Sequence, residues 1–246
     1  MLQVGDTVLV KKGTYNVGAS PSWAVAVNPS RSGTQCDPIK FKAHLGHAVQ
    51  ITTTGGQAAI GSNSRDYIVW EGFVVNMADR AKGILVMGAT GCTISYCEVI
   101  GNYVASTDNH DGIRIERAHD CRVHHCIVRG VKGNSINSAG IKVYSKGAKR
   151  VIIEDNYIYD NTAGVFDKDF GVENTYRRNY FTRNRTQFYG NNQGGPVQYY
   201  IYDNVFDGEI ELHAGNTGTE IHDNLLRCDR LARAWVATPF THTYHR

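Results

Sequence analysis

The chain of 246 residues is long enough for one large domain or two small ones, and an all-β solenoid of this size is ordinary. Glycine contributes 26 residues and proline only 5, so the chain turns often and mostly through glycine, which disfavours a helical bundle. With 41% apolar and 20% charged residues the composition excludes wholesale disorder, and the lack of a long apolar run excludes a membrane span. The net charge of +3 is too small to indicate a nucleic-acid partner, though it is compatible with an acidic ligand.

The first predicted element covers residues 4–15 (VGDTVLVKKGTY). Apolar side chains at Val4, Val8 and Val10 lie between Gly and Asp breakers, a pattern typical of a strand. Residues 1–10 contain neither a basic segment nor a continuous apolar core, so we expect no secretory signal here. The strand starts without a capping element, which indicates that a further piece of chain precedes it.

An internal repeat follows and is the main signal of the sequence. Seven segments share an apolar residue, two polar-leaning residues and then Gly, Cys or Asn, and they follow one another at intervals of 20 to 30 residues. They begin at Val69, Ile94, Val123, Ile153, Tyr176, Ile201 and Ile221. Constant strands joined by turns of variable length are the behaviour of a solenoid.

A second repeat places a short β-branched strand after a glycine, as in Gly112-Ile-Arg-Ile and Gly140-Ile-Lys-Val. Period-two alternation then assigns the faces. The residues expected to point inward are Ile113, Ile115, Ile141, Val143, Ile210 and Leu212, and those expected outward are Arg114, Glu116, Lys142, Tyr144, Glu211 and His213. In the first repeat, Asn156, Asn179, Asn204 and Asn224 are expected to stack in a tight bend, where Asn tolerates the left-handed conformation and bonds to the coils on either side.

Cysteines occur in two Cys-x4-Cys pairs, at positions 92 and 97 and again 29 residues later at 121 and 126. This spacing is a weak match to structural zinc sites, and stacking in neighbouring coils is the better interpretation. Stacked cysteines lie within disulfide range without needing to be oxidised, so the redox compartment stays open.

Acidic residues precede the glycine of several coils by four positions, at Asp79, Asp108 and Asp160, which predicts one column of carboxylates. The richest stretch is residues 106–116 (STDNHDGIRIE). Hard oxygen ligands stacked in this way suit Ca²⁺, whereas the alternative is that Asp and Asn before Gly only close turns.

A basic column accompanies the acidic stretch, because Lys142 stands at the same offset from Gly140 as Arg114 from Gly112. Tyr144 then shares the next column with Glu116, and Lys168 lies beside Tyr144. A lysine next to an arginine feels repulsion that lowers its pKa and makes it a usable base, although most lysines on strands are simply solvated.

Residues 1–226 are therefore predicted to form one solenoid. Residues 227–246 lose the pattern and are predicted to form a cap or tail, the cap being a short helix. The glycine-led strands, the Asn column, the opening residues 5–15 and residues 38–43 (PIKFKA) resemble the right-handed parallel β-helix proteins of the pectate-lyase-like superfamily. The resemblance implies an all-β, single-stranded right-handed parallel β-helix and a secreted or extracellular location.

The same resemblance extends to Ca²⁺-dependent lyases that cleave uronate-containing polysaccharides by β-elimination. It implies Asp79, Asp108 and Asp111 as metal ligands, with Asp167 or Asp169 as a fourth. Arg114 or the metal would neutralise the substrate carboxylate, Lys142 or else Lys168 would be the base, and Tyr144 or His213 would donate a proton. Substrate contacts are expected from Glu116, His110, Tyr189 and Glu211.

Other activities share this fold, so alternatives stay open. Residues 108–111 (DNHD) are also similar to a motif of mannuronan C5-epimerases, and Asp108, Asp111 and Glu116 supply carboxylates for a glycoside hydrolase. A tailspike or adhesin would bind a glycan with Tyr144, Tyr189 and Trp70 without cleaving it. In each case the expected partner is a glycan, an acidic polysaccharide for the lyase, and neither nucleic acid nor a membrane.

Overall fold

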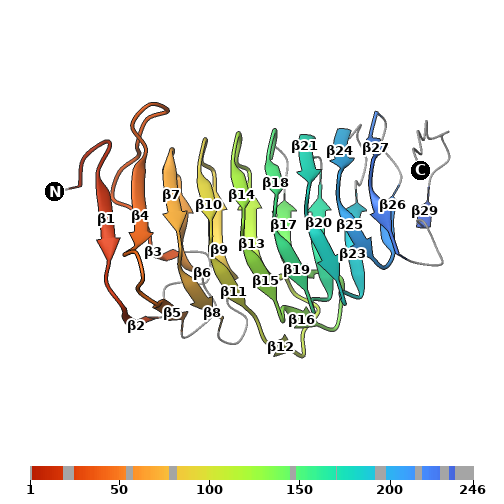
Figure 1. Ribbon diagram of the computed structural model, residues 1–246, viewed down its shortest axis with the longest axis horizontal. Coiled ribbons are helices and arrows are strands. Elements are labelled where there is room, and N and C mark those ends of the chain that lie inside the picture. The colour runs from red at the N-terminus through yellow and green to blue at the C-terminus, as the bar shows by residue number, and fades with distance from the viewer. Residues whose placement is uncertain are drawn as a thin grey trace.

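The protein is a right-handed parallel β-helix. The computed structural model describes residues 2–18, 25–53, 58–77, 82–144, 148–169, 171–191, 198–213, 218–227 and 233–235. Within these residues the chain forms three parallel nine-stranded sheets, which run along one elongated stack of coils with Thr7–Val10 near one end and Arg233–Trp235 at the other (Figure 1). Successive strands belong to different sheets, so each coil contributes one strand to each sheet in turn.

The first sheet comprises β1 (Thr7–Val10), β4 (Ile39–Ala43), β7 (Ile68–Glu71), β10 (Thr93–Ser95), β14 (Arg122–His124), β18 (Ile152–Glu154), β21 (Val172–Arg177), β24 (Gln198–Tyr202) and β27 (Glu220–His222). The second comprises β2 (Gly13–Val17), β5 (Val49–Thr53), β8 (Val74–Asn76), β11 (Glu98–Ile100), β15 (Ile127–Arg129), β19 (Tyr157–Tyr159), β22 (Tyr180–Thr182), β25 (Val205–Asp207) and β28 (Leu225–Leu226). The third comprises β3 (Val25–Val27), β6 (Ala58–Asn63), β9 (Lys82–Met87), β13 (His110–Glu116), β17 (Ser138–Tyr144), β20 (Ala163–Lys168), β23 (Thr186–Asn191), β26 (Ile210–His213) and β29 (Arg233–Trp235). A small pair, β12 (Tyr103–Val104) and β16 (Lys132–Gly133), lies beside them.

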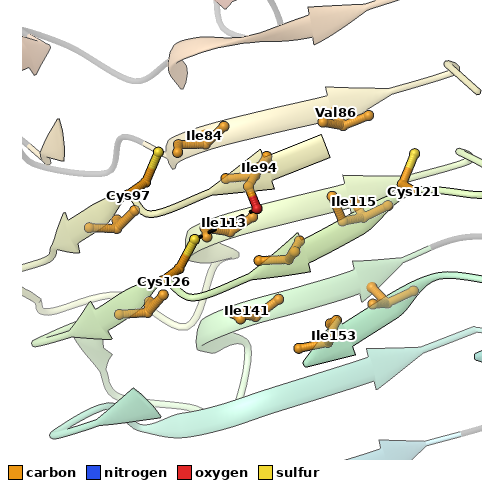
Figure 2. Close-up of a cluster of buried hydrophobic side chains, with 14 of the residues drawn as sticks. Ile84, Val86, Ile94, Cys97, Ile113, Ile115, Cys121, Cys126, Ile141 and Ile153 are labelled. Atoms are coloured by element: carbon orange, nitrogen blue, oxygen red, sulfur yellow. Dashed lines mark hydrogen bonds between the residues drawn. The ribbon is translucent and has the colours of Figure 1, made fainter. Parts of the chain in front are cut away.

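The predicted inward residues form the core. Ile113 pairs in register with Ile84 and Ile141, and the same row continues through Val165 and Phe188. Figure 2 shows Ile84, Ile113 and Ile141 of this row, together with Ile94 and Ile153 of the first sheet. Because identical or similar apolar groups lie one above another at the spacing of β-strands, each coil buries its inner face only against its neighbours.

The column glycines, which are Gly83, Gly112, Gly140 and Gly164 of the third sheet, let neighbouring coils approach closely. A Cβ on Gly112 would lie 2.5 Å from the carbonyl oxygen of Gly140, and one on Gly140 would lie 2.9 Å from that of Gly164. These contacts are shorter than real Cβ atoms show, so no larger residue fits without displacement of the strands. This close approach is the physical reason for the glycine that opens each strand of the repeat.

The predicted Asn stack is present. Asn179 accepts from the backbone NH and side-chain amide of Asn156, and its own amide donates to the Ile153 carbonyl and the Asn204 side chain. Asn224 continues the stack at the next coil. One detail of the prediction is wrong: the left-handed residues are those that precede the asparagines, namely Asp155, Arg178, Asp203 and Asp223. The bend needs positive φ one position earlier, which turns the Asn side chain inward along the stack.

The cysteines of the two pairs are buried and stacked, as the spacing predicts. The register of β10 on β14 sets Cys92 beside Cys121 and Cys97 beside Cys126, and Figure 2 shows the second pair on adjacent coils. All four are free thiols with 1–2% of their surface exposed, whereas Cys36 is exposed. In the earlier coils these cysteines occupy core positions that other residues occupy in later coils. Asn156, for example, follows Cys126 in the next coil and accepts a hydrogen bond from the Cys126 backbone NH.

The stack of coils continues beyond the boundary predicted at residue 226. Arg233–Trp235 is the strand β29, which pairs in parallel with β26, so these three residues extend the third sheet rather than form a capping helix. The rest of the predicted cap, residues 228–232 and 236–246, lies outside the described residues. In the described part of the chain there is no helix of the length and apolarity needed to cross a membrane.

Candidate functional site

The predicted basic column lies on the outer face of the third sheet. The register places Arg114 beside Lys142 and Lys142 beside Phe166, and in the next row Tyr144 lies between Glu116 and Lys168. These strands, β13, β17 and β20, are neighbours in the middle of the stack (Figure 1). The side chains that alternation assigned to one face are therefore brought together.

Lys142 differs from the prediction in one respect, since it is fully buried rather than open to solvent. Its ammonium pairs with Asp111 at 2.8 Å and donates to the Asn109 side chain at 2.8 Å and the Asn137 carbonyl at 2.5 Å. Burial lowers the pKa of Lys142 to about 8, against the opposing attraction of Asp111. Because the ammonium has three protons and three acceptors, Lys142 is held as a structural cation and is not an accessible base.

Asp111 is the anionic centre of this arrangement. It is fully buried, and its carboxylate contacts both Lys142 and the guanidinium of Arg114, the latter at 2.9 Å. Although burial opposes ionisation, the two cations hold the pKa of Asp111 below its ordinary value. Each oxygen of the Asp111 carboxylate already contacts one cation inside the protein, so the structure places Asp111 as an ion-pair partner and not at the predicted calcium site.

Arg114 links the buried part of the site to its surface. Its Nε donates to Glu116 at 2.8 Å, and its guanidinium lies 4.3 Å from the centre of the Tyr144 ring. Burial works against the charge, but Asp111 and Glu116 together raise the pKa of Arg114. The ring of Tyr144 is thus fixed in orientation by a cation that cannot lose its proton.

We name this group the basic cluster. Its members are Lys82, Arg114, Lys142 and Lys168, with the carboxylates Asp111 and Glu116. Lys82 was missed by the sequence analysis because it precedes its column glycine instead of following it; here burial and then Arg114 lower its pKa. Four cations against two carboxylates leave the cluster with an excess of positive charge, which attracts an anionic ligand.

Lys168 and Tyr144 form the accessible rim of the basic cluster. The ammonium of Lys168 lies 5.4 Å from the centre of the Tyr144 ring, 5.8 Å from that of Phe166 and 3.4 Å from the Asn137 side-chain oxygen. Within the described residues it makes no ion pair, in contrast to Lys142 and Arg114. Lys168 is therefore a cation of the cluster that is available to a ligand.

A cleft adjoins this rim along the third sheet. Tyr189 packs edge-on against Phe166 at 4.8 Å and against His213 at 4.7 Å, and Glu211 lies next to it in register. The cleft has a volume of about 350 Å³ and is lined by Asn134, Ser135, Ile136, Arg185, Thr186, Tyr189 and Glu211. Three of the predicted substrate or proton-transfer residues, Tyr189, Glu211 and His213, thus gather at this end of the face.

Arg185 borders this cleft and a second one and was not found from the sequence. The second cleft, of about 430 Å³, is lined by Tyr103, Lys132, Gly133, Asn161, Thr162, Arg183, Asn184 and Arg185. Arg183 is paired with Asp160, whereas the exposed guanidinium of Arg185 has no partner among the described residues. No repeat or motif in the sequence predicts a role for Arg185. Its position between the two clefts depends on how long the loops of the neighbouring coils are.

The remaining predicted site residues lie elsewhere. His110 is buried, with its Nε2 3.3 Å from the Asn102 carbonyl oxygen, so it does not face a ligand. Asp108 lies in the loop before β13 and accepts a hydrogen bond from Ser106. Asp79 lies outside the described residues.

The predicted column of Asp108 and Asp160 is wrong. Asp160 lies at a left-handed bend directly after β19 and pairs with Arg183. Asp108 lies in a loop before β13, and the shorter coil that contains Asp160 has no such loop. Asp167, considered as a further ligand, points into the core, where Tyr176 and Asn174 donate to it. The described residues contain no group of three or more His, Cys, Asp and Glu side chains arranged to hold a metal ion.

Together, the three parallel sheets define a parallel β-helix protein with a charged outer face. The family model described as "Periplasmic copper-binding protein (NosD)" matches residues 5–218, and the chain belongs to this family. The family's description places its members in the periplasm. No curated protein matches the chain.

Solved structures share the fold at low sequence identity. The pectate lyase Pel9A superposes with a TM-score of 0.58 at 15% identity, covering 98% of this chain and 72% of that one. An alginate lyase from Paenibacillus sp. str. FPU-7 superposes with a TM-score of 0.58 at 16% identity, covering 96% of this chain and 93% of that one. ORF18 of Geobacillus virus E2 superposes with a TM-score of 0.54 at 13% identity, covering 97% of this chain and 52% of that one. At these identities the likeness concerns the fold alone.

Proposed function

We propose that the protein binds an acidic, uronate-containing glycan outside the cytoplasm on the outer face of the third sheet and cleaves it by β-elimination. The observation that carries the proposal is the excess positive charge of the basic cluster, with Lys168 free at its rim and the Tyr189 cleft beside it. A uronate chain supplies one carboxylate per sugar and apolar ring faces, which cations and tyrosine rings complement.

The chemistry requires that the C6 carboxylate be stabilised as the C5 proton leaves, that a base take this proton, and that the O4 leaving group receive one. The basic cluster provides the positive field. Lys168 replaces Lys142 as the base, because Lys142 has no exposed surface and Lys168 does. We assign the donation of a proton to the leaving group to Tyr144, whose ring contacts Arg114 and lies 5.4 Å from the Lys168 ammonium. The likeness to pectate and alginate lyases supports this fold as a scaffold for such chemistry.

The test is to mix the protein with pectate, alginate, hyaluronan and heparan-type chains and follow the ultraviolet absorbance of the unsaturated uronate product. Lys168→Ala should lower kcat/KM by about 100-fold or more, the range for loss of a general base. Lys11→Ala, which removes an exposed lysine at the far end of the stack, is the matched control. Because Asp111 is already paired with two cations, activity should persist with a metal chelator.

Two results would contradict the reaction. Full activity in Lys168→Ala would remove the proposed base, and binding without any rise in absorbance would leave the protein a glycan-binding β-helix. In the second case a reducing-end assay on the same samples separates a hydrolase from a protein that only binds. Absence of binding to all four chains would overturn the glycan proposal itself.

A further inference from the structure

The family description raises the question of which side chains here suit copper. Thiolates and imidazoles are suitable donors. The stacked cysteines do not fit an ion that arrives from solution: Cys97 and Cys126 are 2% and 1% exposed, and their thiols donate to backbone carbonyls. Burial and the neighbouring Cys97 raise the pKa of the Cys126 thiol well above its ordinary value, which disfavours the thiolate that a metal needs.

A second pair of donors lies at the surface, where β14 ends. His124 projects from the outer face of the first sheet because Val123 before it points into the core. His125 follows in the left-handed conformation and is exposed. The two Nδ1 atoms lie 2.9 Å apart, and the rings meet edge to face at 5.1 Å between centres. Two imidazole nitrogens therefore face each other with room for one proton between them.

A neighbouring ring limits how far these imidazoles move. Tyr96, at the equivalent bend of the preceding coil, stacks on His125 at 4.9 Å and meets His124 edge-on at 5.7 Å. The pair is thus held together at a site that solvent reaches.

The separation of the two nitrogens matches metal binding. An imidazole nitrogen binds a first-row metal ion at about 2.0 Å, so two nitrogens in adjacent positions of a square arrangement lie about 2.8 Å apart. A cation can replace the shared proton after a small rotation of both rings. Among divalent first-row ions, Cu²⁺ has the highest affinity for such donors and prefers this arrangement.

The geometry points to His124 and His125 as a surface copper site, in which the two Nδ1 atoms bind one Cu²⁺. Two protein ligands leave the other positions of the ion open, which suits an ion that is handed on to another molecule. The site lies on the first sheet, away from the basic cluster on the third, so it is independent of the proposed glycan function.

The experiment is titration of the full chain with Cu²⁺ against a competing chelator, with electron paramagnetic resonance of the one-equivalent complex. His125→Asn keeps a residue that tolerates the left-handed bend, and His124→Gln keeps a polar side chain of similar length. Each should weaken binding of one Cu²⁺ at least 10-fold and reduce the nitrogen couplings in the spectrum. Circular dichroism of both variants verifies that the coils remain folded.

Two matched variants control for the other histidines. His44→Gln with His47→Asn alters another stacked pair, whose Nδ1 atoms contact the Leu45 carbonyl and the Lys12 backbone NH instead of each other. His242→Ala with His245→Ala removes the imidazoles near the end of the chain. Both should leave the high-affinity Cu²⁺ in place. Unchanged affinity in His124→Gln and His125→Asn, or loss of the ion only in a control, would overturn the assignment.

Discussion

A lysine with no exposed surface needs an acceptor for each proton of its ammonium, and Lys142 has them in Asp111, Asn109 and Asn137. Two of these acceptors come from loops, residues 105–109 and 134–137, which fold over the strand. The alternation of β17 correctly predicted the face on which Lys142 lies. It did not predict the burial, because cover by loops of other coils leaves no mark on the strand itself.

At this scale we predict that Lys142→Met destabilises the fold by about 3 kcal/mol or more, because it leaves Asp111 buried with only Arg114. Urea unfolding followed by circular dichroism measures the change. The double variant Lys142→Met with Asp111→Asn should cost less than the sum of the two single changes. Additive costs would mean that the two side chains do not interact as the ion pair described here.

At the scale of elements, the Asn stack and the column glycines hold the bends and strands of successive coils at one spacing. Each Asn joins two coils through both its amide and its carbonyl groups. Each glycine removes the Cβ that would collide with the next strand. The Asn stack and the column glycines are visible in the sequence because each must keep the same spacing from one coil to the next.

Asn179→Ala should lower the free energy of unfolding by about 1–3 kcal/mol, because it leaves the Ile153 carbonyl and Asn156 groups buried without partners. Asn224→Ala removes equivalent bonds at a half-buried position, where water replaces them. Its cost should therefore be smaller. Chemical denaturation of the two variants side by side measures the difference, and equal costs would contradict a role for burial in the stack.

Gly112→Ala should destabilise the protein by about 1–3 kcal/mol, since the new methyl group would lie 2.5 Å from the Gly140 carbonyl oxygen and 2.9 Å from Val128. Gly18→Ala is the matched control, as a Cβ there meets no atom within 4 Å. Thermal unfolding of both compares them directly. A Gly112→Ala protein as stable as the control would show that the strands separate easily.

At the scale of the whole molecule, Asp167 places a carboxyl group on the inner side of the coils, among the apolar stacks. Asp167 is fully buried and accepts hydrogen bonds from Tyr176 and Asn174. Burial raises the pKa of Asp167 to about 6, so the folded protein binds a proton that the unfolded chain releases nearer pH 4. The stability from this group is complete below about pH 4 and declines as the pH rises to about 6.

We therefore expect the stability of the wild-type protein to fall, relative to Asp167→Asn, by about 2 kcal/mol between pH 4 and pH 7. Paired carboxylates such as Glu154, whose pKa the surrounding arginines lower, change the stability with pH in the opposite direction. Subtracting the unfolding free energy of Asp167→Asn from that of the wild-type protein at each pH removes this contribution. Urea unfolding at several pH values measures the difference. A difference that does not vary with pH would mean that Asp167 titrates normally.

The sequence by itself determined the coil repeat, the inward stacks, the Asn column and the shared face of Arg114, Lys142 and Lys168, because these follow from the spacing of residues along strands that every coil repeats. Only the tertiary structure decided which of these charges meet water, since the loops of other coils cover Lys142 and leave Lys168 open. It also decided that Arg185 borders both clefts and that the His124 and His125 rings face each other. These depend on the distance between side chains across a bend or cleft, which no periodicity encodes.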